Sequence, residues 1–344
     1  MNYATPKKVN LLFVGDIMQH QQQLESAFRD SLTFNYEECF KQVKPIIEQA
    51  DISIANLEVT LGLPPYTGYP QFSSPKELAI AVQDAGFDIV LTANNHCLDR
   101  GLKGVISTIK TLDSLGIAHC GTYLDHADRD SLYPLILEKN GIRIAFLNYT
   151  YGTNGINVPK PCIVNLIDTI IIKNDITKAR SKNPNCIIAC MHWGNEYHLQ
   201  PDSQQRSLAK WLISQGVDHI IGAHSHTVQP MELIPNIHKT DNHLIAYSLG
   251  NFISNMSAEH TDNGAIISLS IIKIGAVTKL NSCEYRLVWT ERPIISGKKD
   301  FRVIPSPYLE TDLSPASLTL MNKSIRATRS LLQTYNKNVK EFSK

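Results

Sequence analysis

The sequence predicts an α/β fold in which strands and helices alternate along most of the chain. From residue 10 to about 273, short apolar runs alternate with stretches of helical periodicity, and polar residues directly follow several of the apolar runs. Runs this apolar are typical of strands that are buried on both faces. Asp, Glu, Asn and His at the ends of successive strands can gather at one edge of a sheet. We therefore expect a chemical site at that edge.

The elements follow from these patterns in chain order. Strands are predicted at 9–15, 51–57, 87–93, 142–148, 185–191, 218–223, 243–249 and 265–272. Helices are predicted at 76–85, 102–115, 166–182 and 202–215. Asn140-Gly141 supplies the positive φ angles of a tight hairpin turn before the fourth strand. Two irregular segments, 60–75 with its four prolines and 151–162, are predicted to be loops near the polar edge.

Length and charge restrict the class of protein. The 344 residues are enough for one large domain or two smaller ones. We place a main domain at 1–290 and a C-terminal extension at 291–344. The extension ends in an amphipathic helix near 313–341, expected to dock through its apolar residues Leu318, Met321, Ile325, Leu331 and Leu332. A formal net charge of +1 gives no electrostatic case for nucleic-acid or anionic-membrane binding.

The N-terminus and the cysteines bear on the expected location. The apolar run before Gly15 is too short for a signal-peptide core, and no run approaches the roughly 18 apolar residues of a spanning helix. We expect a cytoplasmic protein without a membrane segment, while a removed leader or an omitted anchor stays open. Seven cysteines, an odd number without a CxxC pair, predict buried free thiols in a reducing compartment.

The first two strands each lead to a carboxylate. Gly15 lets the backbone turn so that Asp16 points off the sheet edge, although Asp16 alone would equally suit a helix cap. Asn56 and Glu58 alternate with Leu57, so both point to one face while Leu57 points into the core. Taken alone, Glu58 would also suit an exposed edge strand. With the other polar runs, both carboxylates are predicted metal ligands.

The third strand is followed by a dense polar run. Asn95 offers an amide oxygen to a hard cation, His96 an imidazole within reach of a reacting group, and Asp99 a carboxylate that orients the imidazole. The alternative is an ordinary helix start, with Asn94 or Asn95 as its cap. Arg100 would hold a substrate carboxylate or phosphate by bidentate hydrogen bonds, or pair with Asp99.

Three further histidines follow later strands. His192 ends the most apolar run, and Glu196 lies four residues beyond it. In extended backbone, residues i and i+2 share a face, so His224 and His226 can converge on one ion or on two adjacent ions. Asn251 would orient a metal-bound histidine or the substrate, or belong to an ordinary turn.

Together the candidate metal ligands are two carboxylates, one amide and three imidazoles: Asp16, Glu58, Asn95, His192, His224 and His226. This mixture suits Mn²⁺, Fe²⁺ or Zn²⁺ better than Ca²⁺, which prefers oxygen ligands throughout. We expect one or two divalent ions. Two such ions about 3.5–4 Å apart would activate a bridging water and stabilise an anionic transition state, which is the chemistry of hydrolysis.

The runs GDIM, NLE, NNHCLDRG, HWGNEY, HSHTVQ and YSLGNF, in this order between residues 15 and 252, carry a family resemblance. The chain resembles the CapA/PgsA poly-γ-glutamate capsule-biosynthesis family of the calcineurin-like metallophosphoesterase superfamily. The resemblance implies a four-layer α/β/β/α sandwich with two mixed sheets packed face to face. It also implies that the six candidate ligands hold metal and that His96, paired with Asp99, donates a proton to the leaving group or stabilises the transition state.

The chain departs from the superfamily pattern at two positions. Met18 stands where a histidine is usual, and Glu58 replaces a shorter bridging aspartate. Both departures are similar to the CapA-like branch and leave occupancy by two metals open. His20 would restore the lost ligand, contact the substrate, or lie on a surface helix.

From the ligand set we expect a metal-dependent hydrolase that acts on a phosphoester or on an amide of an anionic polymer such as polyglutamate. The alternative is a non-catalytic capsule-biosynthesis component that binds polymer in the same pocket, which single-metal occupancy would favour. The expected partner is an anionic small molecule or polymer, and the oligomeric state stays undefined. The expected substrate contacts are His20, Arg100, Glu196 and Asn251.

Overall fold

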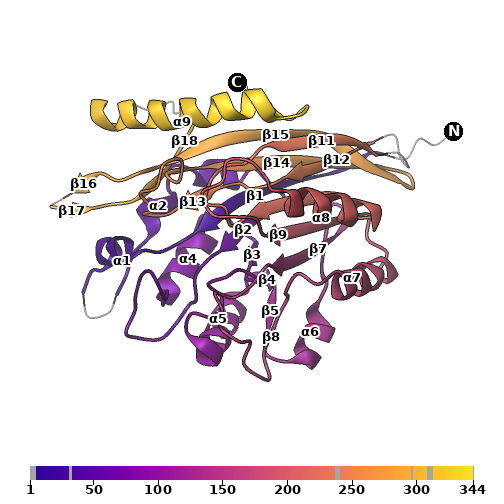
Figure 1. Ribbon diagram of the computed structural model, residues 1–344, viewed down its shortest axis with the longest axis horizontal. Helices are drawn as coiled ribbons and strands as arrows, with labels where there is room; N and C mark the ends of the chain where they lie inside the picture. The colour runs from indigo at the N-terminus through magenta and orange to yellow at the C-terminus, as the bar shows by residue number, and fades with distance from the viewer. Residues whose placement is uncertain (1–4, 31–32, 237–240, 296, 308–312, 344) are drawn as a thin grey trace.

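The structure is a computed structural model that describes residues 5–30, 33–236, 241–295, 297–307 and 313–343. Two β-sheets pack face to face, and Figure 1 shows strands of both sheets lying between α4 (Lys76–Asp84) at the left and α7 (Thr169–Ser181) at the right. The predicted four-layer sandwich with two mixed sheets is confirmed.

The larger sheet runs in the order β18-β15-β14-β1-β2-β3-β4, with β13 beside β1 and β19 beside β15. Its strands are β1 (Lys7–Ile17), β2 (Ile52–Leu57), β3 (Ile89–Leu91), β4 (Ala118–Cys120), β13 (Asn251–Ile253), β14 (Asn263–Ile274), β15 (Val277–Glu291), β18 (Arg302–Pro305) and β19 (Lys340–Glu341). The strands β1 to β4 are parallel, whereas β14 is antiparallel to β1 and β15, and β15 is antiparallel to β18 and parallel to β19.

The smaller sheet runs in the order β11-β12-β10-β9-β7-β6. Its strands are β6 (Leu135–Lys139), β7 (Ile142–Thr150), β9 (Cys186–His192), β10 (His219–Ala223), β11 (Met231–Asn236) and β12 (Asp241–Ala246). Short pairs join β5 (Thr122–Tyr123) to β8 (Ile163–Val164) and β16 (Ile294–Ile295) to β17 (Lys298–Lys299). The other helices are α1 (Gln21–Ala27), α2 (Glu37–Phe40), α3 (Lys44–Ile47), α5 (Gly101–Leu115), α6 (His126–Leu132), α8 (Ser203–Ser214) and α9 (Pro315–Tyr335).

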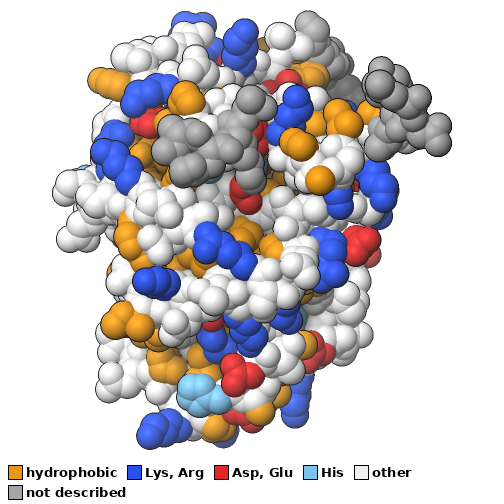
Figure 2. All heavy atoms as spheres, turned by 90° about the vertical axis from the view of Figure 1, so that its right-hand side faces the viewer, with side chains coloured by type: hydrophobic (Ala, Val, Ile, Leu, Met, Phe, Trp, Pro, Cys, Tyr) orange, Lys and Arg blue, Asp and Glu red, His pale blue; other side chains and the backbone are white. Residues whose placement is uncertain are grey.

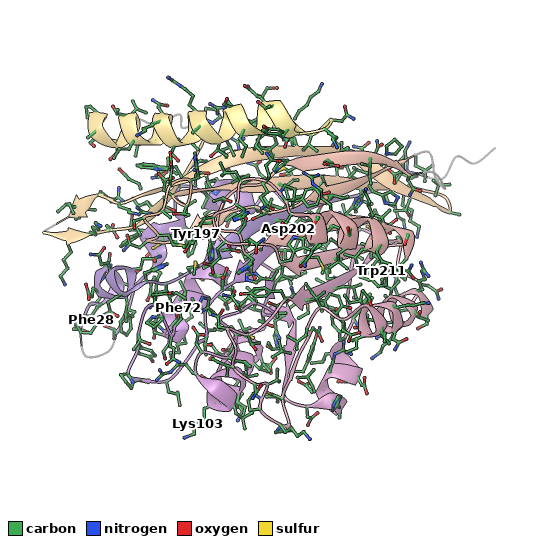
Figure 3. All side chains as sticks on the ribbon, viewed as in Figure 1. Phe28, Phe72, Lys103, Tyr197, Asp202 and Trp211 are labelled. Atoms are coloured by element: carbon green, nitrogen blue, oxygen red, sulfur yellow. The ribbon has the colours of Figure 1, made fainter. Side chains whose placement is uncertain are left out.

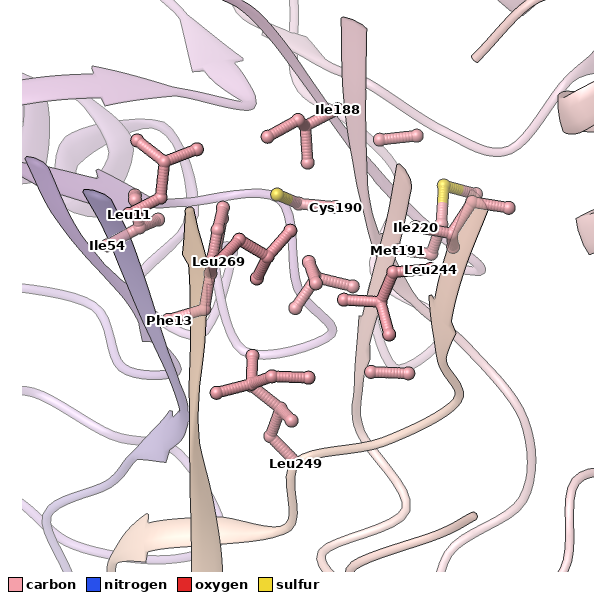
Figure 4. Packing of buried hydrophobic residues seen from close by; sticks show 14 of the residues in the cluster. Leu11, Phe13, Ile54, Ile188, Cys190, Met191, Ile220, Leu244, Leu249 and Leu269 are labelled. Carbon is pink, nitrogen blue, oxygen red and sulfur yellow. The ribbon is translucent and has the colours of Figure 1, made fainter. Parts of the chain in front are cut away.

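The strand β1 is apolar on both faces because each face is buried against a different layer. Phe13 belongs to the core between the two sheets, where its ring centroid lies 6.4 Å from that of Phe146 on β7. Figure 4 shows this core, with Phe13 and Leu269 on the larger sheet opposite Ile188 on the smaller one. The next residue along, Val14, points the other way into the layer that includes α4. Alternate side chains of a strand point to opposite faces, so both faces must be apolar here.

Several local predictions are confirmed and explained by contacts. Asn140 and Gly141 have φ angles of 53° and 71° in the turn between β6 and β7. The helix predicted at 202–215 is α8, whose first turn is capped by Asp202 with Gln205 in a capping box. The seven cysteines are free thiols, and all except Cys283 are buried.

In the last third of the chain one strand was missed and the prediction for the C-terminal helix is wrong in part. The strand β15 was not predicted, because its first half alternates between exposed and half-buried residues and only its second half is buried. The C-terminal helix is shorter than 313–341, and Leu318 is 46% exposed rather than docked. The buried stripe of α9 instead passes through Met321, Ile325 and Leu332, and the helix packs beside β15. The extension also contributes β18 and β19 to the larger sheet.

Surface charge is dispersed where it can be seen. On the face that Figure 2 shows, Lys and Arg side chains are spread over the surface with Asp and Glu among them. Of the described helices, none is long and apolar enough to cross a membrane.

Candidate metal centre

The strand-terminal polar residues meet at one edge of the sandwich. Asp16 and Asn56 lie at the ends of the parallel strands β1 and β2 of the larger sheet. His192 ends β9, and His224 follows β10, in the facing sheet. All four side chains are buried. The edge that the sequence predicted therefore exists, and both sheets contribute to it.

Asp16 is held in place from three directions. Its backbone N–H donates to the Gly250 carbonyl at 2.9 Å, and its Oδ1 accepts from Asn56 Nδ2 at 2.7 Å. Its Oδ2 lies 3.1 Å from His226 Nδ1. A Cβ on Gly15 would collide with the Gly250 carbonyl oxygen, so only glycine permits this close approach.

Glu58 belongs to two overlapping groups of candidate ligands. One group is Asp16, Glu58 and His192, the other is Glu58, His224 and His226, and the ligand atoms within each group lie within 4.8 Å of one another. Glu58 Oε1 lies 3.5 Å from His192 Nε2 and 3.8 Å from His226 Nε2. A carboxylate shared in this way can bridge two ions or complete the shell of one.

The protonation chemistry of the cluster fits a divalent cation. Burial, followed by the neighbouring Asp16, raises the pKa of Glu58 well above its ordinary value. Burial and the nearby imidazoles lower the pKa of His192 well below its ordinary value and that of His224 to about 2. The imidazoles of His192 and His224 therefore favour the neutral form, as metal binding requires, and a cation beside Glu58 would offset the cost of its buried charge.

Two orphaned atoms support the same conclusion. Among the described residues, the buried atoms Glu58 Oε1 and His224 Nδ1 have no hydrogen-bond partner. A buried polar atom without a partner costs on the order of 1–3 kcal/mol. A metal ion would use the lone pairs on both atoms, so these residues fit Mn²⁺, Fe²⁺ or Zn²⁺.

Asn95 joins the cluster through His192. Its Oδ1 lies 2.6 Å from His192 Nε2, and its Nδ2 donates to Asn154 Oδ1 at 3.2 Å. The other ring nitrogen of His192 lies 3.4 Å from Asn56 Nδ2. The loop 151–162 thus reaches the site through Asn154 and fixes which atom Asn95 turns toward His192.

His96 and Asp99 form a buried pair beside the ligands. His96 Nδ1 lies 2.7 Å from Asp99 Oδ2, and that oxygen also accepts from the Phe72 backbone N–H at 2.8 Å. The Phe72 ring packs edge-on against His96 with centroids 4.6 Å apart. The Pro-rich loop 60–75 therefore covers this imidazole, while the contact with Asp99 leaves Nε2 as the ring nitrogen free for chemistry.

The prediction that extended backbone aligns His224 and His226 is wrong. Their φ angles are 98° and 58°, in the left-handed region that non-glycine residues seldom adopt, and both residues follow β10 rather than extend it. Their rings nevertheless converge, with centroids 6.0 Å apart. Strained backbone of this kind is concentrated at functional sites, where the surrounding structure supports it.

His226 is oriented by Asn251 as well as by Asp16. Its Nδ1 lies 3.1 Å from Asn251 Oδ1, and Asn251 Nδ2 donates to the Thr261 carbonyl at 2.9 Å. Nδ1 therefore faces two oxygen acceptors, which leaves Nε2 facing Glu58. Glu196 lies at the solvent side of the site, with Oε1 4.0 Å from His226 Nε2 and 40% of its side chain exposed.

The remaining predicted positions lie outside the two ligand groups. His20 caps α1, and its ring nitrogen Nδ1 accepts from the Asn255 N–H at 3.3 Å. Burial lowers the pKa of His20 to about 4. Arg100 is half-buried at the start of α5. The carboxylate of Asp99, with which Arg100 was expected to pair as one alternative, contacts His96 and Phe72 in the described part of the chain. Met18 is buried and accepts a hydrogen bond through its carbonyl.

Aromatic residues around the site were not assigned by the sequence prediction. Tyr151 packs on His224 with ring centroids 4.4 Å apart, and Tyr197, labelled with Phe72 in Figure 3, lies 6.3 Å from the His226 ring. Tyr151 directly follows β7, so its place after a strand was the available signal. Nothing in the local sequence distinguishes Tyr197 from a surface aromatic.

Comparison with known proteins defines the family. Residues 10–256 match the bacterial capsule synthesis protein family PGA_cap, and the chain belongs to this family. It is 28% identical over 273 residues to "Capsule biosynthesis protein CapA" of Bacillus anthracis, covering 76% of this chain and 63% of that protein. It is 28% identical over 277 residues to "PGA biosynthesis protein CapA" of Bacillus subtilis (strain 168), covering 76% and 68%. The resemblance indicated by the motifs is confirmed, although the chain spans less than two thirds of the first relative.

One solved structure shares the fold at low identity, and a second gives a slightly lower score. The Haemophilus influenzae NAD nucleotidase superposes with a TM-score of 0.50 and 12% identity over 94% of this chain and 61% of that one. The calcineurin-like phosphoesterase YfkN from Bacillus subtilis gives a TM-score of 0.49 and 14% identity over 95% and 99%. At this level of identity the similarity concerns the fold alone.

Proposed function

We propose that the protein is a metal-dependent hydrolase that acts on a phosphoester or on an amide of an anionic polymer such as polyglutamate. The observation that carries this proposal is the double role of Glu58, which joins two ligand groups while its Oε1 lacks a hydrogen-bond partner among the described residues. Asp16, Glu58, Asn95, His192, His224 and His226 would hold the metal. When bound, it would supply an acidified water and stabilise developing negative charge.

The protein residues next to the ligands have distinct tasks in this reaction. His96 donates a proton from Nε2 to the leaving group, and Asp99 holds Nδ1, so that Nε2 is the ring nitrogen left for this transfer. The Phe72 ring keeps water from the His96 imidazole. Glu196, on the solvent side, limits how closely a second negative charge of the substrate approaches.

Metal content and hydrolysis measured together test the proposal. The wild type should contain one to two equivalents of Mn, Fe or Zn and hydrolyse p-nitrophenyl phosphate esters or poly-γ-glutamate. The His224→Ala/His226→Ala variant should lose both metal and hydrolysis, whereas His126→Ala, at an exposed position on α6, should retain both. A wild type that stays without metal and activity after incubation with Mn²⁺ would refute the hydrolase proposal.

A second candidate function rests on Met18. This buried residue stands at a position where a histidine ligand would be expected, and its thioether is a poor ligand for these cations. The candidate is a non-catalytic capsule-biosynthesis component that binds polymer in the same pocket. Binding of poly-γ-glutamate that persists in chelator, without any hydrolysis, would favour it.

A further inference from the structure

A cavity of about 600 Å³ lies directly beside the metal centre. It is bounded by Tyr151 after β7, by the residues that follow β9, and by the first turn of α8. Tyr151 borders both places, because it lines the cavity and its ring packs on His224. The cavity is therefore close enough to the metal centre to be considered as the place for a group attached to the reacting atoms.

One wall of the cavity is aromatic and aliphatic. Tyr151 is 48% exposed even though it packs on His224, so part of its ring remains available to a ligand. Trp193 is buried and fixed by a hydrogen bond of 2.9 Å from Nε1 to the Tyr247 carbonyl. Leu208 extends this wall. A rigid apolar wall of this kind suits a flat, apolar face of a ligand.

Another part of the cavity lining carries hydrogen-bonding groups, all neutral except Asp202. Asn195 Nδ2 donates to Asp202 Oδ2 at 2.9 Å, and Asp202, labelled in Figure 3, also caps α8 through its Oδ1. These contacts fix Asn195 and leave its amide oxygen as an acceptor. Ser203 and Gln204 are exposed at the start of α8 and offer groups that both donate and accept.

The charge of the cavity restricts its ligand. Among the described residues that line the cavity, none is lysine or arginine, and Asp202 is the acidic one. A carboxylate-rich polymer segment placed here would meet Asp202 without a compensating cation, which is unfavourable. A phosphate placed here would face the same repulsion. The part of the substrate in this cavity is therefore neutral and rich in hydrogen-bonding groups.

We propose that the cavity beside Tyr151 binds a neutral sugar ring, so that the substrate is a sugar phosphate ester whose phosphate lies at the metal centre. This inference rests on the proposed function and selects the phosphoester over the polymer amide. The C–H face of a sugar ring packs on Tyr151, and its hydroxyl groups hydrogen-bond to Asn195, Ser203 and Gln204.

The test compares two non-hydrolysable ligands that differ only by the sugar ring. The two ligands are methylphosphonate and glucosylmethylphosphonate. Each is titrated calorimetrically into the Mn²⁺-loaded full chain. The glucosyl compound should bind at least about tenfold more tightly, a difference of about 1.4 kcal/mol. Ser203→Trp, which fills the cavity, should abolish this preference. Ser207→Trp, on the same helix at an exposed position that does not line the cavity, should preserve it.

Each other outcome contradicts a defined part of the reasoning. Equal affinities for the two phosphonates, or an unchanged preference in Ser203→Trp, would overturn the sugar site while leaving the metal centre intact. Tetra-γ-glutamate that binds more tightly than the glucosyl compound, with its binding lost in Ser203→Trp, would assign the cavity to an anionic polymer instead. Failure of both phosphonates to bind to protein that contains metal would refute the phosphoesterase function itself, and the sugar site with it.

Discussion

Replacing Glu58 by glutamine should stabilise the metal-free protein and weaken its response to metal. Burial and Asp16 raise the pKa of the folded carboxyl, so the folded state retains a proton that the unfolded state releases above about pH 4.5. Stability therefore falls as the pH rises above the ordinary pKa. The loss is about 1.4 kcal/mol for each pH unit as long as the folded carboxyl keeps its proton. Glutamine fills the same space without this loss.

The size of the effect is measurable by calorimetry. At two pH units above the ordinary pKa, in chelator, the free energy of unfolding of Glu58→Gln should exceed that of the wild type by at most about 2.7 kcal/mol. Unfolding entropy of about 2.1 cal/mol/K per residue over 344 residues converts this to about 4 °C in Tm. Mn²⁺ at about 100 times its Kd should raise the wild-type Tm by a similar amount through mass action. The variant should gain less, because both ligand groups have lost their shared carboxylate.

The assay is scanning calorimetry of both proteins at about pH 4.5 and pH 6.5, in chelator and in excess Mn²⁺. Glu138→Gln, at an exposed position of β6, is the matched control and should behave as the wild type. The reasoning would be refuted if Glu58→Gln were no more stable than the wild type in chelator at the higher pH. An equal rise in Tm with Mn²⁺ would refute the shared-ligand role.

Three further predictions concern other parts of the chain. His96→Ala should lower kcat about 10²–10⁴-fold on a phosphoester with a poor leaving group, and Asp99→Asn should lower kcat less. Steady-state kinetics measure kcat, and elemental analysis should show an unchanged metal content. A loss of metal in either variant would contradict this assignment. Because burial lowers the pKa of His20 to about 4, this group should lower the folding stability by roughly 3 kcal/mol as the pH drops from 6.5 toward 4. Urea unfolding of His20→Gln should show a smaller fall in stability over the same pH range. An identical fall in the wild type and the variant would contradict the argument. Leu332→Ala, in the buried stripe of α9, should lower the free energy of unfolding measured in urea by about 2–5 kcal/mol. Leu320→Ala, at a position that is 58% exposed, should lower it by less than about 0.5 kcal/mol. Equal effects of the two substitutions would show that α9 does not stabilise the protein through packing.

Local sequence patterns predicted the elements whose residues are apolar on both faces. The runs that became β1, β2, β9 and β10 have this character because each strand is covered on two sides. The pattern failed at β15, where one half of the strand is largely solvent-exposed. It also failed at Leu318, because helical spacing alone does not say which stripe of α9 faces β15.

The candidate ligands followed from the sequence because parallel strands end at a common edge, so polar residues after each strand must meet there. The sequence by itself thus determined the α/β class, the edge and the residue types at the site. Tertiary structure decided what those residues contact: Asn56 donates to Asp16, Asn251 contacts His226, Phe72 packs on His96, and Tyr151 packs on His224 beside the neighbouring cavity. Each of these contacts joins segments far apart in the chain, and its geometry depends on how two sheets and their loops pack, which local periodicity does not encode.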